Sequence, residues 1–85
     1  MPKQKIKQDA LIPIGMNIRT IRKQRGVGQT ELVAQLQLMG INMTRETLVK
    51  IERGIQHLQA TQLRGIRDAL QTTYEELLRE MDSKS

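Results

Sequence analysis

Apolar side chains recur at intervals of three or four residues in nearly every segment of this chain, and no segment shows the two-residue alternation of a β-strand. Ile14, Ile18 and Ile21 would share one face of a helix, and later segments repeat the pattern. A chain of 85 residues is long enough for one compact domain with a small core. We therefore expect an all-α fold in a single domain, whose function lies on its surface or in a shallow groove.

Glycine and threonine residues mark the ends of the predicted helices. Glycines, which tolerate the left-handed conformation at helix ends, separate the apolar segments: Gly26, Gly28, Gly40 and Gly54. Threonines that can cap a helix N-terminus precede three of these segments: Thr44, Thr61 and Thr73, the last in a capping box with Glu76. These signals predict five helices, over residues 14–25, 29–38, 45–53, 62–71 and 74–81.

Positive charge is concentrated near the start of the chain. Residues 1–25 carry seven basic side chains and one acidic one, a balance of +6 within a net charge of +5. We expect residues 1–12 to form a basic, flexible arm, residues 13–81 the domain, and residues 82–85 a frayed tail. This distribution suits a polyanionic partner, but basic surfaces also aid solubility, so charge alone leaves both interpretations open.

Several kinds of chemistry are excluded by the residues that this chain lacks. It has no Cys, Trp or Phe and a single Tyr, which excludes disulfides, thiolate metal sites, cysteine nucleophiles and aromatic base-stacking platforms. The only histidine, His57, has no neighbouring set of metal ligands or catalytic partners. No apolar run approaches the length of a membrane span, and the first residues lack the apolar core of a signal peptide. We expect a cytoplasmic, non-enzymatic protein with no cofactor, no metal and no membrane partner.

Two opposite charges flank the predicted core. Arg22 lies at the edge of the apolar stripe of the helix over 14–25, and Glu52 lies beside the apolar stripe of the helix over 45–53. A half-buried carboxylate needs a partner, because an unpaired buried charge costs several kcal/mol. We expect Arg22 and Glu52 to form a structural ion pair; the alternative is two separately hydrated side chains.

The helix over 45–53 has a charged outer face. Leu48 and Ile51 define the inward direction of this helix. The residues that then point away from the core are Glu46, Val49, Lys50 and Arg53. Such a face is available to a partner.

Three stretches in this order resemble the lambda-repressor-like helix-turn-helix family, also called the xenobiotic-response-element family: GVGQTELVAQL, TRETLVKIERG and ALQTTYEELL. The resemblance covers about residues 14–78. Its most specific elements are Gln29 at the start of one predicted helix, the Glu52-Arg53-Gly54 ending of another, and the finish from Ala69-Leu70 to Leu77-Leu78. The resemblance implies a compact five-helix DNA-binding domain.

The resemblance also implies that the helix over 45–53 is a recognition helix that enters the major groove of double-stranded DNA. The positions from which relatives touch bases are occupied by Thr44, Arg45, Glu46, Val49 and Lys50. Arginine and lysine can donate to guanine, glutamate can accept from cytosine, and valine can pack on a thymine methyl group. At the start of the helix over 29–38, Gln29 and Thr30 stand with free backbone amides where relatives hold a phosphate, and Arg53 matches a second phosphate contact. The ion pair inferred above also has a counterpart in the family.

The chain departs from the family pattern between Leu32 and Thr44, where it has about five extra residues. The extra segment is apolar and contains Leu38, Met39, Ile41 and Met43. We expect an enlarged connection in which a glycine reverses the chain, so that Ile41 and Met43 return to the core; the alternative is a cluster that meets a second copy across a dimer axis. Two smaller departures are Gly28 at a helix N-cap and Gln71 in place of the usual glycine.

We expect a sequence-specific regulator of transcription, most simply a repressor, that binds double-stranded DNA as a homodimer on a two-fold related operator. The alternative is an antitoxin-like or adaptor module that binds a protein partner, with DNA binding secondary. Basic residues on the outward face of the helix over 45–53 favour DNA, because an adaptor would tolerate acidic or apolar residues there.

Overall fold

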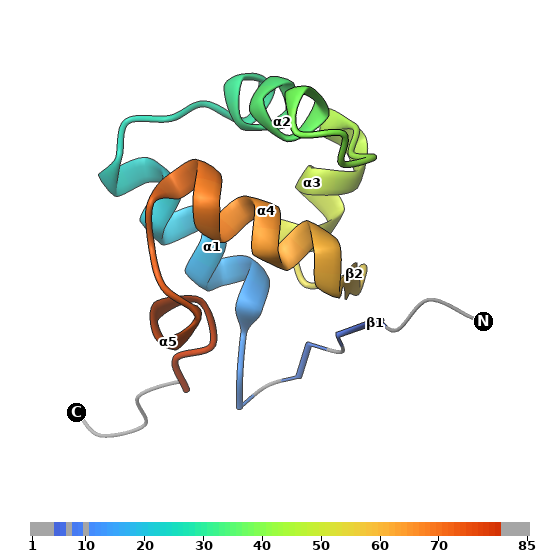
Figure 1. Ribbon diagram of the computed structural model, residues 1–85. Coiled ribbons are helices and arrows are strands. Elements are labelled where there is room, and N and C mark those ends of the chain that lie inside the picture. The colour runs from blue at the N-terminus through green and yellow to red at the C-terminus, as the bar shows by residue number, and fades with distance from the viewer. Residues whose placement is uncertain (1–4, 7, 10, 81–85) are drawn as a thin grey trace.

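A computed structural model of the protein describes residues 5, 6, 8, 9 and 11–80. Five helices make up most of this structure, and two short strands pair at one edge (Figure 1). The elements are β1 (Lys5–Ile6), α1 (Ile14–Gln24), α2 (Gln29–Leu38), α3 (Arg45–Glu52), β2 (Leu58–Gln59), α4 (Ala60–Leu70) and α5 (Tyr74–Leu77). The expected all-α class with five helices is confirmed. None of the helices in this part of the chain is long and apolar enough to cross a lipid bilayer.

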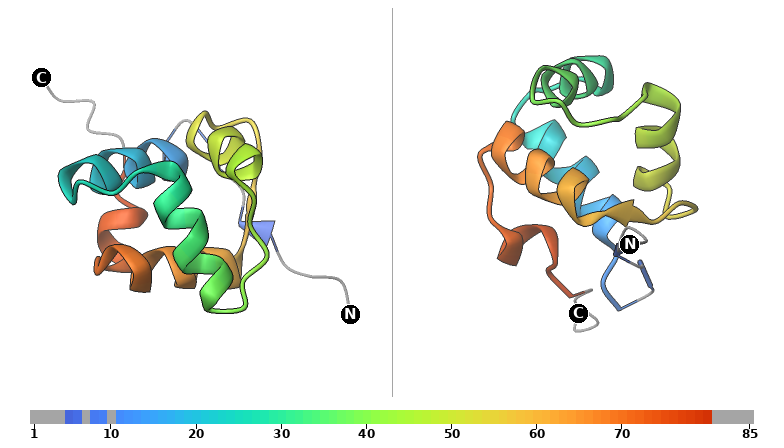
Figure 2. Two further views of the ribbon diagram at one scale, coloured as in Figure 1. Left: turned by 90° about the horizontal axis from the view of Figure 1, so that it is seen from above. Right: turned by 45° about the vertical axis from the view of Figure 1, so that its right-hand side comes forward.

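One apolar core lies between the helices. Its buried side chains come from all five helices, from β2 and from the connection between α2 and α3: Ile14, Ile18, Ile21, Leu32, Val33, Leu36, Met43, Leu48, Ile51, Leu58, Leu63, Ile66, Leu70 and Leu77. Helix α3 packs chiefly against α1 and α2, and α4 packs chiefly against α2. As a result α3 lies at the edge of the molecule, with one side left open to solvent (Figure 2).

The connection between α2 and α3 folds back on the domain. Gly40 adopts a φ of 78°, a left-handed conformation that ends α2 and reverses the chain. Met43 is then 2% exposed, and Ile41 packs against the core. The expected return of these two side chains to the core is confirmed, whereas Leu38 and Met39 stay outside with exposed fractions of 89% and 46%.

Side-chain amides fix the backbone of this connection. Gln37 Nε2, from α2, donates to the carbonyl of Met43 at 3.0 Å. Gln62 Nε2, from α4, donates to the carbonyl of Asn42 at 3.0 Å, and the Gln62 side chain is itself buried. The residues that lead into α3 are therefore held by hydrogen bonds from the helices on either side.

The predicted cap at Thr61 is wrong. The start of α4 is held by two glutamines, because the backbone N–H of Gln59, the residue before the helix, donates to Gln62 Oε1 at 2.8 Å. Helix α4 therefore begins at Ala60, directly after β2, and Thr61 lies within its first turn.

The last helix is shorter than the predicted span of 74–81. Thr73 Oγ1 caps α5 by accepting from the N–H of Glu76 at 3.1 Å, but the Glu76 carboxylate binds Arg79 Nη2 at 2.6 Å instead of completing the capping box. The helix ends at Leu77, where Asn17 Nδ2 from α1 donates to the carbonyls of Leu77 at 2.9 Å and Arg79 at 3.0 Å. Those carbonyls are satisfied by a side chain, so the helix need not continue to satisfy them.

Residues 5, 6, 8 and 9 lie against the domain. Strand β1 pairs antiparallel with β2, with Lys5 opposite Gln59 and Ile6 opposite Leu58, and Ile6 packs against the core. Asp9 Oδ1 accepts from two backbone N–H groups just before α1, each at 2.9 Å, which shapes the turn into that helix. The described part of the predicted arm over 1–12 is thus attached to the body of the protein. Residues 1–4, 7 and 10, like the predicted tail over 82–85, lie outside the described residues.

Candidate nucleic-acid interface

Helix α3 is short and well delimited. Its N-cap is Thr44, whose hydroxyl accepts from the N–H of Thr47 at 3.1 Å and donates to Thr47 Oγ1 at 3.0 Å. Leu48 and Ile51 are buried and fix the inward face. Gly54, with a φ of 80°, ends the helix. The Thr44 hydroxyl is therefore engaged within the protein, although its side chain remains on the exposed surface.

The outward face of α3 carries the residues that the sequence placed there. Glu46, Lys50 and Arg53 are exposed, and Val49 is partly buried. Arg45, which the resemblance placed among the base contacts, is exposed as well. Lys50 Nζ lies 3.7 Å from Glu46 Oε2, one turn away, with 47% and 80% of the two side chains exposed. An exposed pair at this spacing contributes only a few tenths of a kcal/mol to stability. Lys50 and Glu46 can therefore separate and each bind another ligand at little cost.

A shallow groove runs beside this face. It is bounded by α1, the start of α2 and the end of α3, and it is lined by Met16, Arg19, Gln29, Val49, Glu52 and Arg53. Arg19 was not among the residues predicted for the site. Helical periodicity relative to Ile14, Ile18 and Ile21 puts Arg19 on the outer side of α1. Its place across the groove from α3 depends on how the two helices cross, and the local sequence pattern does not contain that information.

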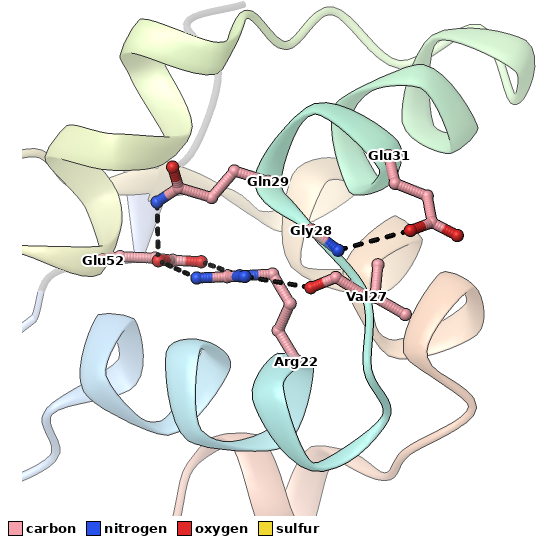
Figure 3. A network of polar contacts seen from close by, with 6 residues as sticks. All are labelled: Arg22, Val27, Gly28, Gln29, Glu31 and Glu52. Carbon is pink, nitrogen blue, oxygen red and sulfur yellow. Dashed lines mark hydrogen bonds and ion pairs between the residues drawn. The ribbon is translucent and has the colours of Figure 1, made fainter.

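A buried polar network forms the floor of this region (Figure 3). Arg22 Nε donates to Glu52 Oε2 at 2.8 Å and Arg22 Nη2 donates to Glu52 Oε1 at 3.0 Å, with each residue 7% exposed. Arg22 Nη1 donates to the Val27 carbonyl at 2.9 Å, and Gln29 Nε2 donates to Glu52 Oε1 at 3.0 Å. The two residues predicted to pair thus lie in bidentate contact, and the network ties α1 to the start of α2 and the end of α3.

The start of α2 presents polar groups toward the groove. The hydrogen bond to Glu52 uses one hydrogen of the Gln29 amide and leaves the second available to a ligand. Thr30 is exposed in the same turn. Gly28 has no side chain with which to cap the helix, but its N–H donates to Glu31 Oε1 at 3.3 Å, so part of the capping interaction is present.

The guanidinium groups of the described residues fall into two sets. Four donate to protein oxygens, those of Arg22, Arg25, Arg67 and Arg79. Within the described part of the chain, no ion pair or side-chain hydrogen bond involves the other four, Arg19, Arg45, Arg53 and Arg64. Arg19, Arg45 and Arg53 lie on α3, directly after it or across the groove from it, whereas Arg64 lies on α4. Three of the four guanidinium groups without such a partner are therefore gathered around α3.

Other kinds of site find no support in residues 5, 6, 8, 9 and 11–80. No group of three or more acidic or histidine side chains there could hold a metal ion. His57 has a structural contact, because its Nδ1 accepts from the backbone N–H of Gln8 at 3.2 Å. The histidine thus helps to attach Gln8 to the domain.

Comparison with known proteins gives a result for structure only. No protein-family profile and no curated protein matches the sequence. The structure of the restriction-modification controller protein C.AhdI from Aeromonas hydrophila is similar over 78% of this chain and 92% of that chain, with 23% identity and a TM-score of 0.65. The hypothetical transcription factor NHTF from Neisseria is similar over 94% of this chain and 87% of that chain, with 23% identity and a TM-score of 0.68. The lambda-repressor-like helix-turn-helix fold expected from the sequence is confirmed.

Proposed function

We propose that this protein is a sequence-specific, double-stranded DNA-binding regulator of transcription. The observation that carries the proposal is the set of unpaired guanidinium groups of Arg19, Arg45 and Arg53 around the solvent-facing side of α3. An α-helix of this size fits the major groove, and a cationic rim would meet the phosphates on either side of it. The two proteins of similar fold are described as a controller protein and a hypothetical transcription factor, which supports the same class.

Within α3 the residues divide by the base edges that they can read. Arg45 and Lys50 donate to guanine O6 and N7, and Glu46 accepts from cytosine N4. Val49, partly buried at the groove, packs on a thymine methyl group. Lys50 leaves its weak contact with Glu46 when a base offers a better acceptor.

Contacts with the DNA phosphates come from both sides of the groove in the protein. Arg53 at the end of α3 and Arg19 on α1 bind phosphates, and the first turn of α2 binds another through the Gln29 amide and the exposed N–H groups near Thr30. These contacts carry no sequence information, but they set how α3 enters the groove. Thr44 donates to a phosphate or a base only if its hydroxyl gives up its hydrogen bond to Thr47 Oγ1, whereas its remaining lone pair can accept from a base amino group.

We further propose that two copies bind one operator. Helix α3 has eight residues and reads only a few base pairs, so a single copy gives limited specificity. A homodimer on half-sites about 10 to 10.5 base pairs apart doubles the contacts, and an operator covered in this way is closed to polymerase, which makes repression the simplest outcome.

A second candidate function follows from one exposed feature. Leu38 and Met39 lie together at the end of α2, with exposed fractions of 89% and 46%. An adaptor or antitoxin-like protein would use such apolar side chains to bind another protein, with DNA binding secondary. The arginines around α3 favour DNA as the first ligand.

Selection of bound sequences from random duplexes tests the proposal. We expect a two-fold related consensus, with an intact operator bound more tightly than either half. Arg45→Ala should abolish the enrichment, while Arg64→Ala on α4 should leave it unchanged. Enrichment of no sequence, or equal loss in both variants, would show that α3 is not the reading element.

A further inference from the structure

The side chain of Gln8 joins three segments that are far apart in the sequence. Its Oε1 accepts from the N–H of Gly15 in the first turn of α1 at 2.7 Å. Its Nε2 donates to the carbonyl of Ile51 near the end of α3 at 2.9 Å and to the carbonyl of Gln56 at 3.0 Å. We call this set of three hydrogen bonds the Gln8 clasp. All three are partly buried.

The clasp binds backbone groups at the start of α1 and on both sides of the end of α3. The N–H of Gly15 belongs to the first turn of α1, where backbone donors have no partner within the helix. The carbonyls of Ile51 and Gln56 stand before and after the turn that ends α3. Gln8 Nε2 therefore bridges both ends of that turn. Two backbone hydrogen bonds close the same turn, from the Gly54 N–H to the Ile51 carbonyl and from the Ile55 N–H to the Lys50 carbonyl, each at 3.0 Å.

Arg53 lies inside the bridged turn. It follows the last residue of α3 directly, and Gln8 and Arg53 line the same hollow, together with Asp9, Pro13, Met16, Glu52 and Gly54. Arg53 also lines the groove that Arg19 enters from α1. The clasp thus fixes the end of α3, where Arg53 lines the groove, relative to α1, from which Arg19 lines it.

We infer that Gln8 is a positioning residue for DNA binding, which holds Arg53 at the distance from α1 that lets Arg19 and Arg53 bind phosphates together. The inference rests on the proposed function. Gln8 itself touches no DNA in this account, and its effect passes through Arg53. Loss of the clasp therefore weakens binding to all duplexes alike and leaves base preference, which depends on the earlier turns of α3, unchanged.

The test replaces Gln8 by methionine, which keeps the length of the side chain and removes its hydrogen bonds. Gln24→Met is the matched control, because Gln24 is exposed at the end of α1 and makes no side-chain hydrogen bond with a described residue. Amide hydrogen exchange of the folded protein is the first measurement. We expect exchange at Gly54 and Ile55 to become at least about threefold faster in the Gln8 variant, with Leu48 at the start of α3 unchanged. Unchanged exchange at Gly54 and Ile55 would overturn the clasp.

The second measurement is a binding cycle with Arg53→Ala. If Gln8 acts through Arg53, Gln8→Met should lower DNA affinity about threefold to tenfold in the wild-type background and have no further effect in the Arg53→Ala background. Equal loss in both backgrounds would overturn the positioning role. Should the wild-type protein bind no duplex, the proposed function fails, and the exchange measurement still decides whether the clasp holds the end of α3.

A second variant protects the test against loss of folding. Gln8→Glu keeps an acceptor for the Gly15 N–H but, when ionised, has no donor for the two carbonyls. This variant should speed exchange at Gly54 and Ile55 while the amide of Gly15 stays protected. Faster exchange at all three positions would instead indicate a general loss of packing and would contradict the clasp.

Discussion

The backbone of Gly15 in α1 lies directly against the carbonyl group of Ile51 in α3. A Cβ atom placed on Gly15 would stand 1.8 Å from Ile51 O and 2.9 Å from the Cα of Glu52. The contact is between backbones, so no side-chain rotation can make room for another atom. This approach brings α1 close enough to α3 for the two helices to share one groove.

Gly15→Ala is therefore expected to destabilise the protein, although alanine is the better helix former by about 1 kcal/mol. The clash should cost at least about 1 to 3 kcal/mol, because one of the helices must shift. Gly28→Ala is the steric control, since no atom lies within 4 Å of a Cβ at that position and its backbone is extended; it should lose only the preference of an N-cap for glycine over alanine, about 1 kcal/mol or less. Denaturant unfolding of both variants measures the difference. A Gly15 variant as stable as the control would mean that α1 and α3 do not approach so closely.

Arg22→Ala should destabilise the protein far more than Arg19→Ala. Removal of Arg22 leaves the buried Glu52 carboxylate with only the Gln29 amide, a loss of about 3 to 5 kcal/mol. Arg19 is exposed and makes no internal ion pair with a described residue. Thermal melts followed by circular dichroism compare the two. Equal melting temperatures would contradict a buried pair that contributes to stability.

The Arg22 and Glu52 pair also predicts a rescue. Replacement of both residues by methionine removes both charges together, so the double variant should recover most of the stability that Arg22→Ala loses. A double variant no more stable than the single one would show that the hydrogen bonds to Val27 and Gln29 matter more than the buried charge.

Lys50→Ala and Arg53→Ala should weaken DNA binding in different ways. Loss of Lys50 should cost about 1 to 3 kcal/mol at one preferred base and relax specificity there. Loss of Arg53 should weaken all duplexes alike and lower the slope of log affinity against log salt by about 1. Titrations on the selected operator, on single-base variants and at several salt concentrations separate the two patterns. If both variants behaved alike, the division of α3 into base and phosphate contacts would be wrong.

The connection between α2 and α3 predicts a contrast between two pairs of apolar residues. Serine at both Ile41 and Met43 should lower stability by about 3 kcal/mol or more, because Met43 is 2% exposed and Ile41 packs on the core. Serine at both Leu38 and Met39 should change stability by less than about 0.5 kcal/mol, since those side chains are exposed. Melting temperatures at two protein concentrations provide the measurement. A dependence on concentration in the first variant would indicate burial between two copies instead.

Gln71 offers a route to higher stability. It adopts a φ of 54° after α4, a left-handed conformation that costs a residue with a side chain about 1 kcal/mol or more. Gln71→Gly should relieve that strain, but glycine loses more conformational entropy on folding. The net effect should be a gain of about 0.5 kcal/mol in the free energy of unfolding. Arg64→Gly in the exposed middle of α4 should instead lose about 1 kcal/mol. A destabilised Gln71 variant would show that the side chain has an unrecognised stabilising contact.

The sequence allowed the helices and the charged pair to be predicted because both depend on local periodicity. Helical spacing orients Arg22 and Glu52 toward the core without any knowledge of the tertiary structure. Thr44 was likewise recognisable as a cap from its position before α3. The roles of the α3 residues in DNA binding are predictions that rest on the fold and on the charge around it.

Contacts between distant segments could not be predicted in this way. Gln8 and Ile51 are 43 residues apart, and no pattern around Gln8 indicates that its amide will meet α3. The same holds for Asn17, which ends α5 from a distance of 60 residues, and for Arg19, whose neighbours depend on the crossing of α1 and α3. Such contacts follow from the packed arrangement of the helices and become visible only with it.

The fold holds α3 from one side and by its two ends. Leu48, Ile51 and Glu52 anchor it inward, the fold-back before Thr44 fixes its start, and the Gln8 side chain secures its end. Within the described part of the chain, the exposed side chains on the outward face of α3 make one ion pair, the weak one between Lys50 and Glu46. Under the proposed function, a lineage can therefore change which operator the domain reads by substitutions on one short helix, without repacking the core. For the same reason α3 is the natural place to graft the reading residues of another regulator onto this scaffold.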